Sequence, residues 1–409
     1  MAEHEKQAVN TAPADVEVGS AEDVEAVMKK YDRESNVRIW TGFPARLVRY
    51  GMALFMLTMI WVSMFSTAEG SVRRCFFLGI VLAFVFIMYP IKKNMKLKPN
   101  HIPIYDVVLL VVAVGVYFYQ IIFKEELIAM GRRIGTPQII IGIIAILVLV
   151  EACRRVVGIP IIIVAAAFVA YTLLPMGADK PLQGTIYNLV YTTNGIIGTP
   201  IQVCSTYIFL FVLFGSFLEA TGIAAFFIDC ANSIAGAATG GPAKVAVISS
   251  ALCGMVSGSS VGNTVTTGAV TIPLMKRTGY PPEFAGAVEA AASTGGQIMP
   301  PIMGAAAFLM AEYMNIPYAK VAVKAILPAV LYFTGIFIAV HLEAKKLGLK
   351  GMPKSEMVSW GELAKRAYLI IPLALLIFLV SSGSRTMQFS AAVSILAAIV
   401  VGFLNKDER

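Results

Sequence analysis

Apolar segments alternate with short polar stretches along most of this 409-residue chain, after a polar stretch at residues 1–40. A run of about 20 apolar residues is long enough to cross a bilayer as a helix. Runs near this length form a first group at 45–66, 74–91, 103–123, 137–153 and 156–176. A second group follows at 202–222, 241–257, 263–275, 282–315, 320–343, 366–382 and 387–404. The pattern predicts an all-α, polytopic membrane protein.

Two stretches of the second group contain residues that suit neither a regular helix nor contact with lipid. Residues 254–268 read GMVSGSSVGNTVTTG, and residues 293–301 read STGGQIMPP. Glycines and small hydroxyl residues free the backbone, and an unpaired N–H or C=O in lipid is costly. We therefore expect 241–257 and 263–275 to form a re-entrant hairpin. We expect the helix over 282–315 to break before Pro300, because proline removes a donor and clashes with the preceding turn.

Each interruption also has a simpler interpretation. Small residues commonly serve close packing between membrane helices, so the Ser/Gly-rich stretch could be a packing motif. Prolines within a membrane helix could produce only a kink. Two adjacent prolines shortly after a Gly-Gly pair favour a break over a kink, but the residues alone leave both alternatives open.

The composition agrees with a membrane protein. Hydrophobic residues make up 57% of the chain and charged residues 14%, whereas a soluble globular domain carries about 25% charged residues. The net charge of +8 could suit nucleic acid, but the Lys and Arg residues cluster in short loops between apolar spans. Such clusters orient a membrane protein, with the positive loops in the cytoplasm. We therefore expect a lipid bilayer and no nucleic acid as partner, with both termini cytoplasmic.

Residues suited to catalysis or metal chelation are scarce. The five cysteines lie singly in or beside apolar runs, without a Cys-x-x-Cys pair, and are expected to be small buried hydrophobic residues. The three histidines are assigned to terminal or loop positions, and no Ser/His/Asp or Cys/His arrangement is evident. We therefore expect no enzymatic activity and no organic cofactor.

Oxygen atoms dominate the two interruptions and indicate the ligands. Hydroxyl and carbonyl oxygens are hard donors suited to Na⁺, and the N-terminal ends of half-helices attract carboxylates. Gly258 and Gly262 permit a tight reversal that aims carbonyls inward. We predict that Na⁺ is held by Ser257, Gly258, Ser259, Thr294, Gly295 and Gly296. We predict that the substrate contacts Ser260, Asn263, Thr264, Thr267, Gln297 and Pro300.

Four carboxylates lie in or near apolar spans, where such groups are commonly functional. Glu151 lies one turn before two arginines and is expected to pair with them. Glu219 and Glu312 lie near the predicted ends of spans and are expected at the interface. Glu289 lies in the middle of a helix and is the best candidate for a carboxylate that faces a cavity.

Two apolar blocks of different character meet near residue 180. The first is rich in Ile, Leu, Val and Phe, whereas the second is rich in the small residues that let helices approach closely. We therefore expect four parts. They are a polar cytoplasmic segment at 1–40, scaffold helices at 41–180, a transport part at 181–345 and connecting membrane helices at 346–409.

Taken together, these motifs resemble the membrane component of tripartite ATP-independent periplasmic (TRAP) transporters, specifically the fused permease of the TAXI subtype. The resemblance covers nearly the whole chain and is strongest at 254–268, 276–286 and 289–304, with weaker support at 149–158. It implies a four-helix small-permease part at 41–180, followed by half of an inverted-repeat elevator transporter. It also implies Na⁺-coupled uptake across the inner membrane of an organic acid, a dicarboxylate or an amino acid such as glutamate. A periplasmic binding protein would deliver this substrate.

One departure concerns the second half of the transport part. Such transporters carry two inverted repeats, each with interrupted helices, whereas residues 305–409 offer only Ser-Ser-Gly-Ser at 381–384. We therefore expect either a separate chain with the complementary repeat or a truncated or split permease. Three other classes stay open: an ion channel with several copies around a pore, an intramembrane enzyme, and a purely structural membrane subunit of a larger complex.

Overall fold

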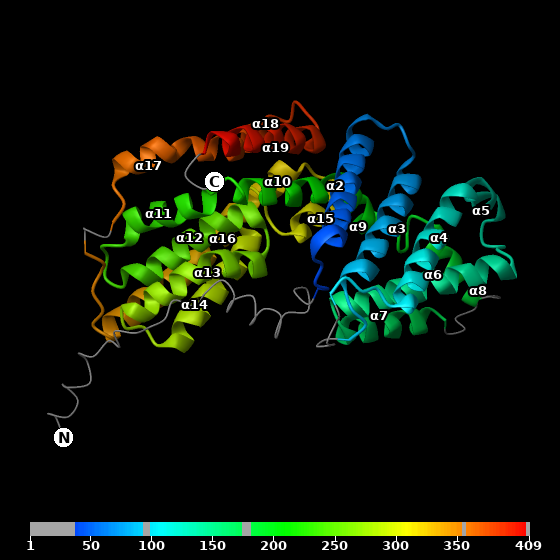
Figure 1. Cartoon of the computed structure of the whole chain (residues 1–409), viewed down its shortest axis with the longest axis horizontal. Coiled ribbons are helices and arrows are strands. Elements are labelled where there is room, and N and C mark those ends of the chain that lie inside the picture. The colour runs from blue at the N-terminus through cyan, green and yellow to red at the C-terminus, as the bar shows by residue number, and fades with distance from the viewer. Residues whose placement is uncertain (1–36, 93–98, 174–180, 354–356, 406–409) are drawn as a thin grey trace, which may run out of the picture. The chain divides into compact units, whose positions relative to one another are not determined.

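The structure is a computed structural model that describes residues 37–92, 99–173, 181–353 and 357–405 (Figure 1). Every regular element in these residues is a helix, so the predicted all-α class is confirmed. Most of the polar segment at 1–40 and the boundary predicted near residue 180 lie outside the described residues. The chain forms two compact units, a first unit within Glu25–Thr206 and a second unit within Tyr207–Arg409.

In the first unit, a helix lies over each of the five predicted apolar runs, with bounds shifted by a few residues. Helices α3, α4 and α6 pack around a core that includes Cys75, Leu82, Phe86, Tyr117 and Val148. The elements of this unit are α2 (Gly42–Phe65), α3 (Gly70–Met88), α4 (Ile104–Ile122), α5 (Lys124–Met130), α6 (Thr136–Val156), α7 (Ile159–Thr172), α8 (Pro181–Ile186), the π-helix η1 (Tyr187–Tyr191) and α9 (Thr199–Val203).

In the second unit, α12 and α13 lie side by side and pack against α14 and α16 (Figure 1). Its elements, with the π-helix η2 (Cys204–Ile208) at the junction of the units, are α10 (Phe209–Glu219), α11 (Ile223–Ala235), α12 (Gly241–Ser257), α13 (Ser260–Arg277), α14 (Pro282–Gly295), the 3₁₀ turn η3 (Gly296–Ile298), α15 (Ala305–Tyr313), α16 (Tyr318–Lys346), α17 (Trp360–Arg366), the 3₁₀ turn η5 (Ala367–Ile370), α18 (Ile371–Ser382) and α19 (Met387–Leu404).

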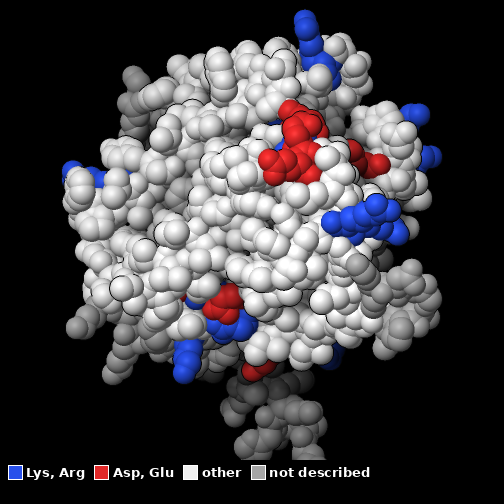
Figure 2. Space-filling model, turned by 90° about the vertical axis from the view of Figure 1, so that its right-hand side faces the viewer, with Lys and Arg blue, Asp and Glu red and all other residues white. Residues whose placement is uncertain are grey.

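Seven helical segments among the described residues are long and apolar enough to cross a membrane. They are Gly42–Phe65, Gly70–Met88, Ile104–Ile122, Thr199–Glu219, Tyr318–Lys346, Trp360–Ser382 and Met387–Leu404. On the face shown in Figure 2, the charged residues gather in a few groups, and the surface between the upper and lower groups is uncharged. These features indicate a multi-pass membrane protein.

Two expectations about the second unit were wrong. No segment was predicted between 222 and 241, where α11 forms; Asp229 interrupts its apolar run and pairs with Arg366 of α17 at 2.8 Å. A helix with a polar side that faces its neighbour lacks the uninterrupted apolar run from which the other helices were predicted. His341, assigned to a terminal or loop position, lies in α16, within the apolar run predicted at 320–343.

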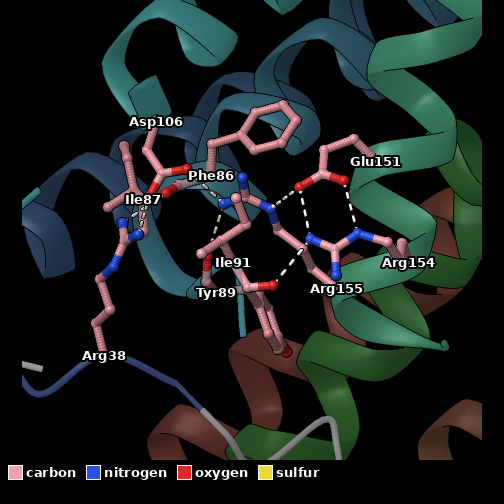
Figure 3. Close-up of polar contacts among 9 residues, drawn as sticks. All are labelled: Arg38, Phe86, Ile87, Tyr89, Ile91, Asp106, Glu151, Arg154 and Arg155. Atoms are coloured by element: carbon pink, nitrogen blue, oxygen red, sulfur yellow. Dashed lines mark hydrogen bonds and ion pairs between the residues drawn. The ribbon is translucent and has the colours of Figure 1, made fainter. Parts of the chain in front are cut away.

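A buried ion-pair network organises one end of the first unit (Figure 3). Asp106, fully buried in the first turn of α4, pairs with Arg38 from the segment before α2 and with Arg155 of α6, whose Nη1 lies 2.6 Å from Asp106 Oδ1. The guanidinium of Arg38 donates to Phe86 O at 2.7 Å, and that of Arg155 donates to Tyr89 O at 3.1 Å. The network therefore ties the segment before α2 to the ends of α3, α4 and α6.

Glu151 extends this network toward the surface. Its two carboxylate oxygens each lie 2.7 Å from an arginine Nε, that of Arg155 on one side and that of Arg154 on the other. Arg154 also donates to Ile91 O at 2.8 Å. The predicted pairing of Glu151 with the two arginines is confirmed, so this carboxylate is part of the scaffold.

Candidate functional site

The first predicted interruption forms a tight turn between two antiparallel helices. Gly258 stands between α12 and α13 with a φ of +60°, a left-handed conformation that favours glycine. Ser259 caps α13, with its Oγ accepting from Gly262 N at 3.2 Å. Deeper in the pair, Asn263 Nδ2 donates to Ser250 O at 2.8 Å. The two helices therefore form a hairpin with a polar tip.

The second predicted interruption breaks a helix completely. Helix α14 tightens into η3, residues 299–304 form no helix, and α15 then begins. Ile302 N donates to Met255 O of the hairpin at 3.2 Å. Tyr318, at the start of α16, donates its hydroxyl to Pro301 O at 2.8 Å. The broken segment is thus fixed by hydrogen bonds to the hairpin on one side and to α16 on the other.

The hairpin and the broken helix meet at two glycines. A Cβ on Gly254 of α12 would lie closer than 3.0 Å to the Cα of Gly296 in η3, and a Cβ on Gly296 would meet Gly254 in the same way. Beside this contact, Asn263 stands within van der Waals distance of both positions. Gln297 Nε2 also donates to Ser260 Oγ at 3.2 Å. Backbone therefore packs on backbone where the two interruptions cross.

Charged residues lie at the base of the hairpin and are absent from its body. Residues 245–275 contain no charged residue. Lys244 is buried near the start of α12 and lies 3.1 Å from His341 Nδ1 of α16. In the turn that follows α13, burial raises the pKa of Tyr280 to about 12, so its hydroxyl keeps its proton and donates to Gly240 O at 3.4 Å. The base of the hairpin therefore carries charged residues and is held by hydrogen bonds, whereas its tip is polar and uncharged.

The residues predicted to bind ligands differ in their burial. Exposed members are Ser259, Thr294 and Gln297. Half-buried members are Ser257, Gly258, Ser260, Thr264 and Pro300. Buried members are Asn263, Thr267, Gly295 and Gly296. The structure brings the hairpin members Ser260 and Asn263 together with Gln297 and Gly296 of the broken helix. Their roles in binding stay predictions.

Three other residues of the predicted set have side-chain or packing contacts away from this crossing. Thr294 donates its hydroxyl to Ala290 O in its own helix at 2.8 Å. A Cβ on Gly295 would overlap the ring of Tyr332, so this glycine serves the packing of α14 on α16. Pro300 lines an apolar pocket of about 250 Å³ with residues of α10, α16 and α18. Such a lining suits an apolar group better than a carboxylate.

Asn263 offers an oxygen without a partner at the crossing. Its side chain is 1% exposed, and its Oδ1 accepts no hydrogen bond from the described residues. A buried carbonyl oxygen that accepts nothing loses the free energy of a hydrogen bond, so a donor or a cation at this position would be stabilised. The neutral oxygens nearby fit a monovalent cation, since hard cations prefer oxygen ligands.

Glu289 occupies a second polar centre, deeper between the same helices. The residue is completely buried in α14 and lies among four hydroxyl groups. Its Oε1 lies 2.9 Å from Ser250 Oγ, 2.5 Å from Thr267 Oγ1 and 3.0 Å from Ser293 Oγ. Its Oε2 lies 2.5 Å from Thr271 Oγ1. Helices α12, α13 and α14 therefore share one hydrogen-bonded carboxyl group.

The remaining carboxylates lie near the ends of their helices, and their position at a membrane interface stays a prediction. Glu219 is the last residue of α10 and is exposed. Glu312 lies in the last turn of α15, where its Oε2 accepts from the hydroxyl of Tyr207 at 3.0 Å.

Comparison with known families decides where this geometry belongs. A family model described as the DctM component of tripartite ATP-independent periplasmic transporters matches residues 144–409, which include the hairpin, the broken helix and both polar centres. The chain belongs to the DctM family. This result confirms the TRAP resemblance at the level of the large permease.

Individual relatives of this DctM family member are large permeases with different substrates in their names. The chain is 27% identical over 237 residues to the C4-dicarboxylate TRAP transporter large permease protein DctM of Pseudomonas aeruginosa, covering 56% of this chain and 55% of the relative. It is 26% identical over 193 residues to the sialic acid large permease SiaM of Vibrio cholerae, covering 47% and 45%. It is 23% identical over 189 residues to the 2,3-diketo-L-gulonate large permease YiaN of Escherichia coli, covering 46% and 44%.

The chain spans about half the length of the curated relatives that it matches. These relatives are permeases, so the expectation that the chain is not an enzyme is confirmed.

In this DctM family member, sequence analysis noted Glu289 but missed the hydroxyl groups around it. We call these four groups, from Ser250, Thr267, Thr271 and Ser293, the hydroxyl cage. A signal existed in the spacing. Thr267 and Thr271 stand four residues apart, as do Glu289 and Ser293, and such pairs share one face of a helix. Two helices that each carry a polar face in an apolar region must turn these faces toward each other.

Replacing Thr271 with valine is expected to destabilise this DctM family member by about 1–3 kcal/mol, because a buried carboxyl oxygen loses its hydroxyl partner. The measurement is the unfolding midpoint of the purified protein in detergent. Thr266→Val is the matched control on the same helix, since that half-buried hydroxyl donates only to Gly262 O in its own helix. Equal midpoints for the two variants would show that the cage contributes nothing to stability.

Proposed function

We propose that this chain is part of the membrane permease of a Na⁺-coupled secondary transporter that imports an organic acid. The crossing of the hairpin and the broken helix supports this proposal, because interrupted helices in membranes commonly build ion and substrate sites. One observation carries it: Gly254 and Gly296 approach closely beside Asn263 Oδ1, which has no hydrogen-bond partner among the described residues. A periplasmic binding protein would deliver the substrate, as the family description suggests.

The proposed Na⁺ site uses neutral oxygens. Asn263 supplies its amide oxygen and Ser257 its hydroxyl, and the turns at 257–259 and 294–296 supply backbone carbonyls. The second turn ends α14, and the carbonyl end of a helix carries a partial negative charge that favours a cation. A monovalent cation fits this set better than a divalent one. The proposed ligands are all neutral, so none of them supplies a negative charge to balance a second positive charge.

The proposed substrate site lies at the exposed side of the same crossing. Helix α13 begins at Ser260, and the free N–H groups of a helix start favour an anionic group. Gln297 is exposed and bonded to Ser260, so both side chains can bind a polar ligand that reaches the tip. A carboxylate is the group that this end attracts, which supports an organic acid such as a dicarboxylate or an amino acid.

The proposed membrane placement is re-entrant. The charged residues at the base and the uncharged body at 245–275 support a hairpin that enters and leaves on one side, with its tip inside the bilayer. We propose an inner-membrane location with the N-terminus cytoplasmic, a small-permease part at 41–180 and an elevator movement of the hairpin. A complementary second repeat would complete the site.

Substrate uptake in proteoliposomes tests this function. With the complete permease and its binding protein present, we expect uptake under a Na⁺ gradient and none when K⁺ replaces Na⁺. Asn263→Ala is expected to raise the Na⁺ concentration for half-maximal uptake about 10-fold, the equivalent of one lost ligand at about 1.4 kcal/mol. Thr266→Val is the control and should leave this concentration unchanged. Uptake that proceeds equally in K⁺ would refute the coupling.

A further inference from the structure

The break between α14 and α15 leaves backbone groups that no helix pairs. Residues 299–304 form no helix, and Pro300 and Pro301 have no N–H to donate. Among the described residues, Pro301 O and Met303 N share a single hydrogen-bond partner, the hydroxyl group of Tyr318. A buried backbone group without a partner is costly. This hydroxyl group therefore stabilises the broken segment at two points.

The hydroxyl group of Tyr318 makes both bonds at once, and its partners fix the direction of each. Met303 N can only donate and does so at 3.3 Å, whereas Pro301 O can only accept and does so at 2.8 Å. A tyrosine hydroxyl has one hydrogen to donate and can also accept. The side chain is 4% exposed, and its ring stacks on that of Phe308 in α15, with centroids 4.3 Å apart and planes 6° from parallel. Packing outside residues 299–304 therefore holds the hydroxyl group in place.

The segment that Tyr318 holds packs on the turn of the hairpin. A Cβ on Gly258 would lie 3.0 Å from Met303 O and 3.5 Å from Ile302 O. A Cβ on Gly304 would lie 3.6 Å from Gly258 O. Gly258 belongs to the turn whose carbonyl groups are proposed to bind Na⁺. A displacement of the broken segment would therefore remove the surface against which this turn lies.

We propose that Tyr318 is a positioning residue of the cation site, which raises the affinity for Na⁺ without touching the ion. Its hydroxyl group holds residues 301–303 against Gly258 and so keeps the hairpin and the broken helix in the arrangement that binds Na⁺. Without this group, the segment leaves the turn in a larger fraction of the molecules. The apparent affinity of a site falls with the fraction of molecules in the binding arrangement. This inference rests on the proposed Na⁺-coupled function.

Tyr318→Phe and Tyr332→Phe form a matched pair of variants. Both tyrosines lie in α16, and each substitution removes one hydroxyl group and keeps the ring. The hydroxyl of Tyr332 donates to Ala291 O at 2.8 Å, a carbonyl within the unbroken α14. Both variants lose a hydroxyl group bonded to backbone, but only Tyr318→Phe acts on the break.

Hydrogen exchange of the purified full chain tests the hydrogen bonds of Tyr318 without any transport assay. Exchange in residues 299–304 is expected to be about 5-fold faster in Tyr318→Phe than in the wild type, because lost hydrogen bonds favour local opening. Tyr332→Phe should exchange in this segment as the wild type does. Equal exchange in Tyr318→Phe and the wild type would overturn the proposal.

Uptake by the complete permease with its binding protein tests the effect on Na⁺. Tyr318→Phe is expected to raise the Na⁺ concentration for half-maximal uptake about 5-fold. Uptake at saturating Na⁺ should stay near the wild-type rate, because bound Na⁺ restores the arrangement, and Tyr332→Phe should change neither quantity. Wild-type uptake that is equal in Na⁺ and K⁺ would refute the coupling and this inference with it. Na⁺-dependent uptake with the same half-maximal concentration in both variants would overturn only the role of Tyr318.

Discussion

Replacing Asp106 with asparagine is expected to destabilise the first unit by about 3–5 kcal/mol, the usual effect of breaking a buried ion pair. Asp106 is fully buried and balances the buried guanidinium groups of Arg38 and Arg155. Asparagine keeps the size of the side chain but removes the negative charge. Arg38 then has no carboxylate partner among the described residues, and Arg155 keeps only Glu151, which it shares with Arg154.

The unfolding midpoint in detergent measures this effect, and a decrease of roughly 10 °C or more is expected for a unit of this size. Glu343→Gln is the control. Glu343 pairs with Lys346 at 3.2 Å, but the lysine side chain is 73% exposed, so the loss should be at most about 1 kcal/mol. A midpoint for Asp106→Asn as high as that of the control would show that the network is not a determinant of stability.

Replacing Gly254 with alanine is expected to reduce Na⁺-driven uptake by about 100-fold, the scale of effect that misplaced binding groups can produce. The added methyl group would collide with the backbone of Gly296, which has no flexible side chain to move aside. The hairpin and the broken helix must then separate, and Asn263 loses its position beside both. Gly296→Ala should act in the same way, because it places the methyl group in the same contact.

Gly286→Ala is the matched control for this prediction. Gly286 lies inside α14, and a Cβ at this position meets no atom within 4 Å. Alanine favours a helix over glycine by about 1 kcal/mol, so this variant should be as stable as the wild type or more stable, with unchanged uptake. If Gly254→Ala also transported at the wild-type rate, the backbone crossing would not be part of the transport site.

The helices and their interruptions could be predicted because each follows from local chemistry. Long apolar runs identified the membrane helices, and Pro300 with its preceding glycines located the break. Helix α11 was missed because Asp229 interrupts its apolar run and is balanced by Arg366, more than a hundred residues later in the chain. Only the folded chain shows that partner.

The candidate site was predictable to a similar depth. The Ser/Gly-rich tip and the Gly-Gly-Gln turn were both identified, and the structure joins them at Gly254 and Gly296. Which hydroxyl groups contact Glu289 and which face the hairpin tip could not be predicted. Thr267 was assigned to the substrate but lies fully buried against Glu289, since the packing of three helices decides which face of α13 is turned inward.

The position of Arg38 bears on how this protein can be handled in the laboratory. The residue precedes α2, the first helix among the described residues, and belongs to a stretch that sequence composition alone would mark for removal. Yet its side chain is 4% exposed and bonded to Asp106 and to Phe86 O. Shortened versions of the chain should therefore keep every residue from Val37 onward, and so should versions with a fusion tag and a protease site. Removing Arg38 would remove its bonds to Asp106 and to Phe86 O.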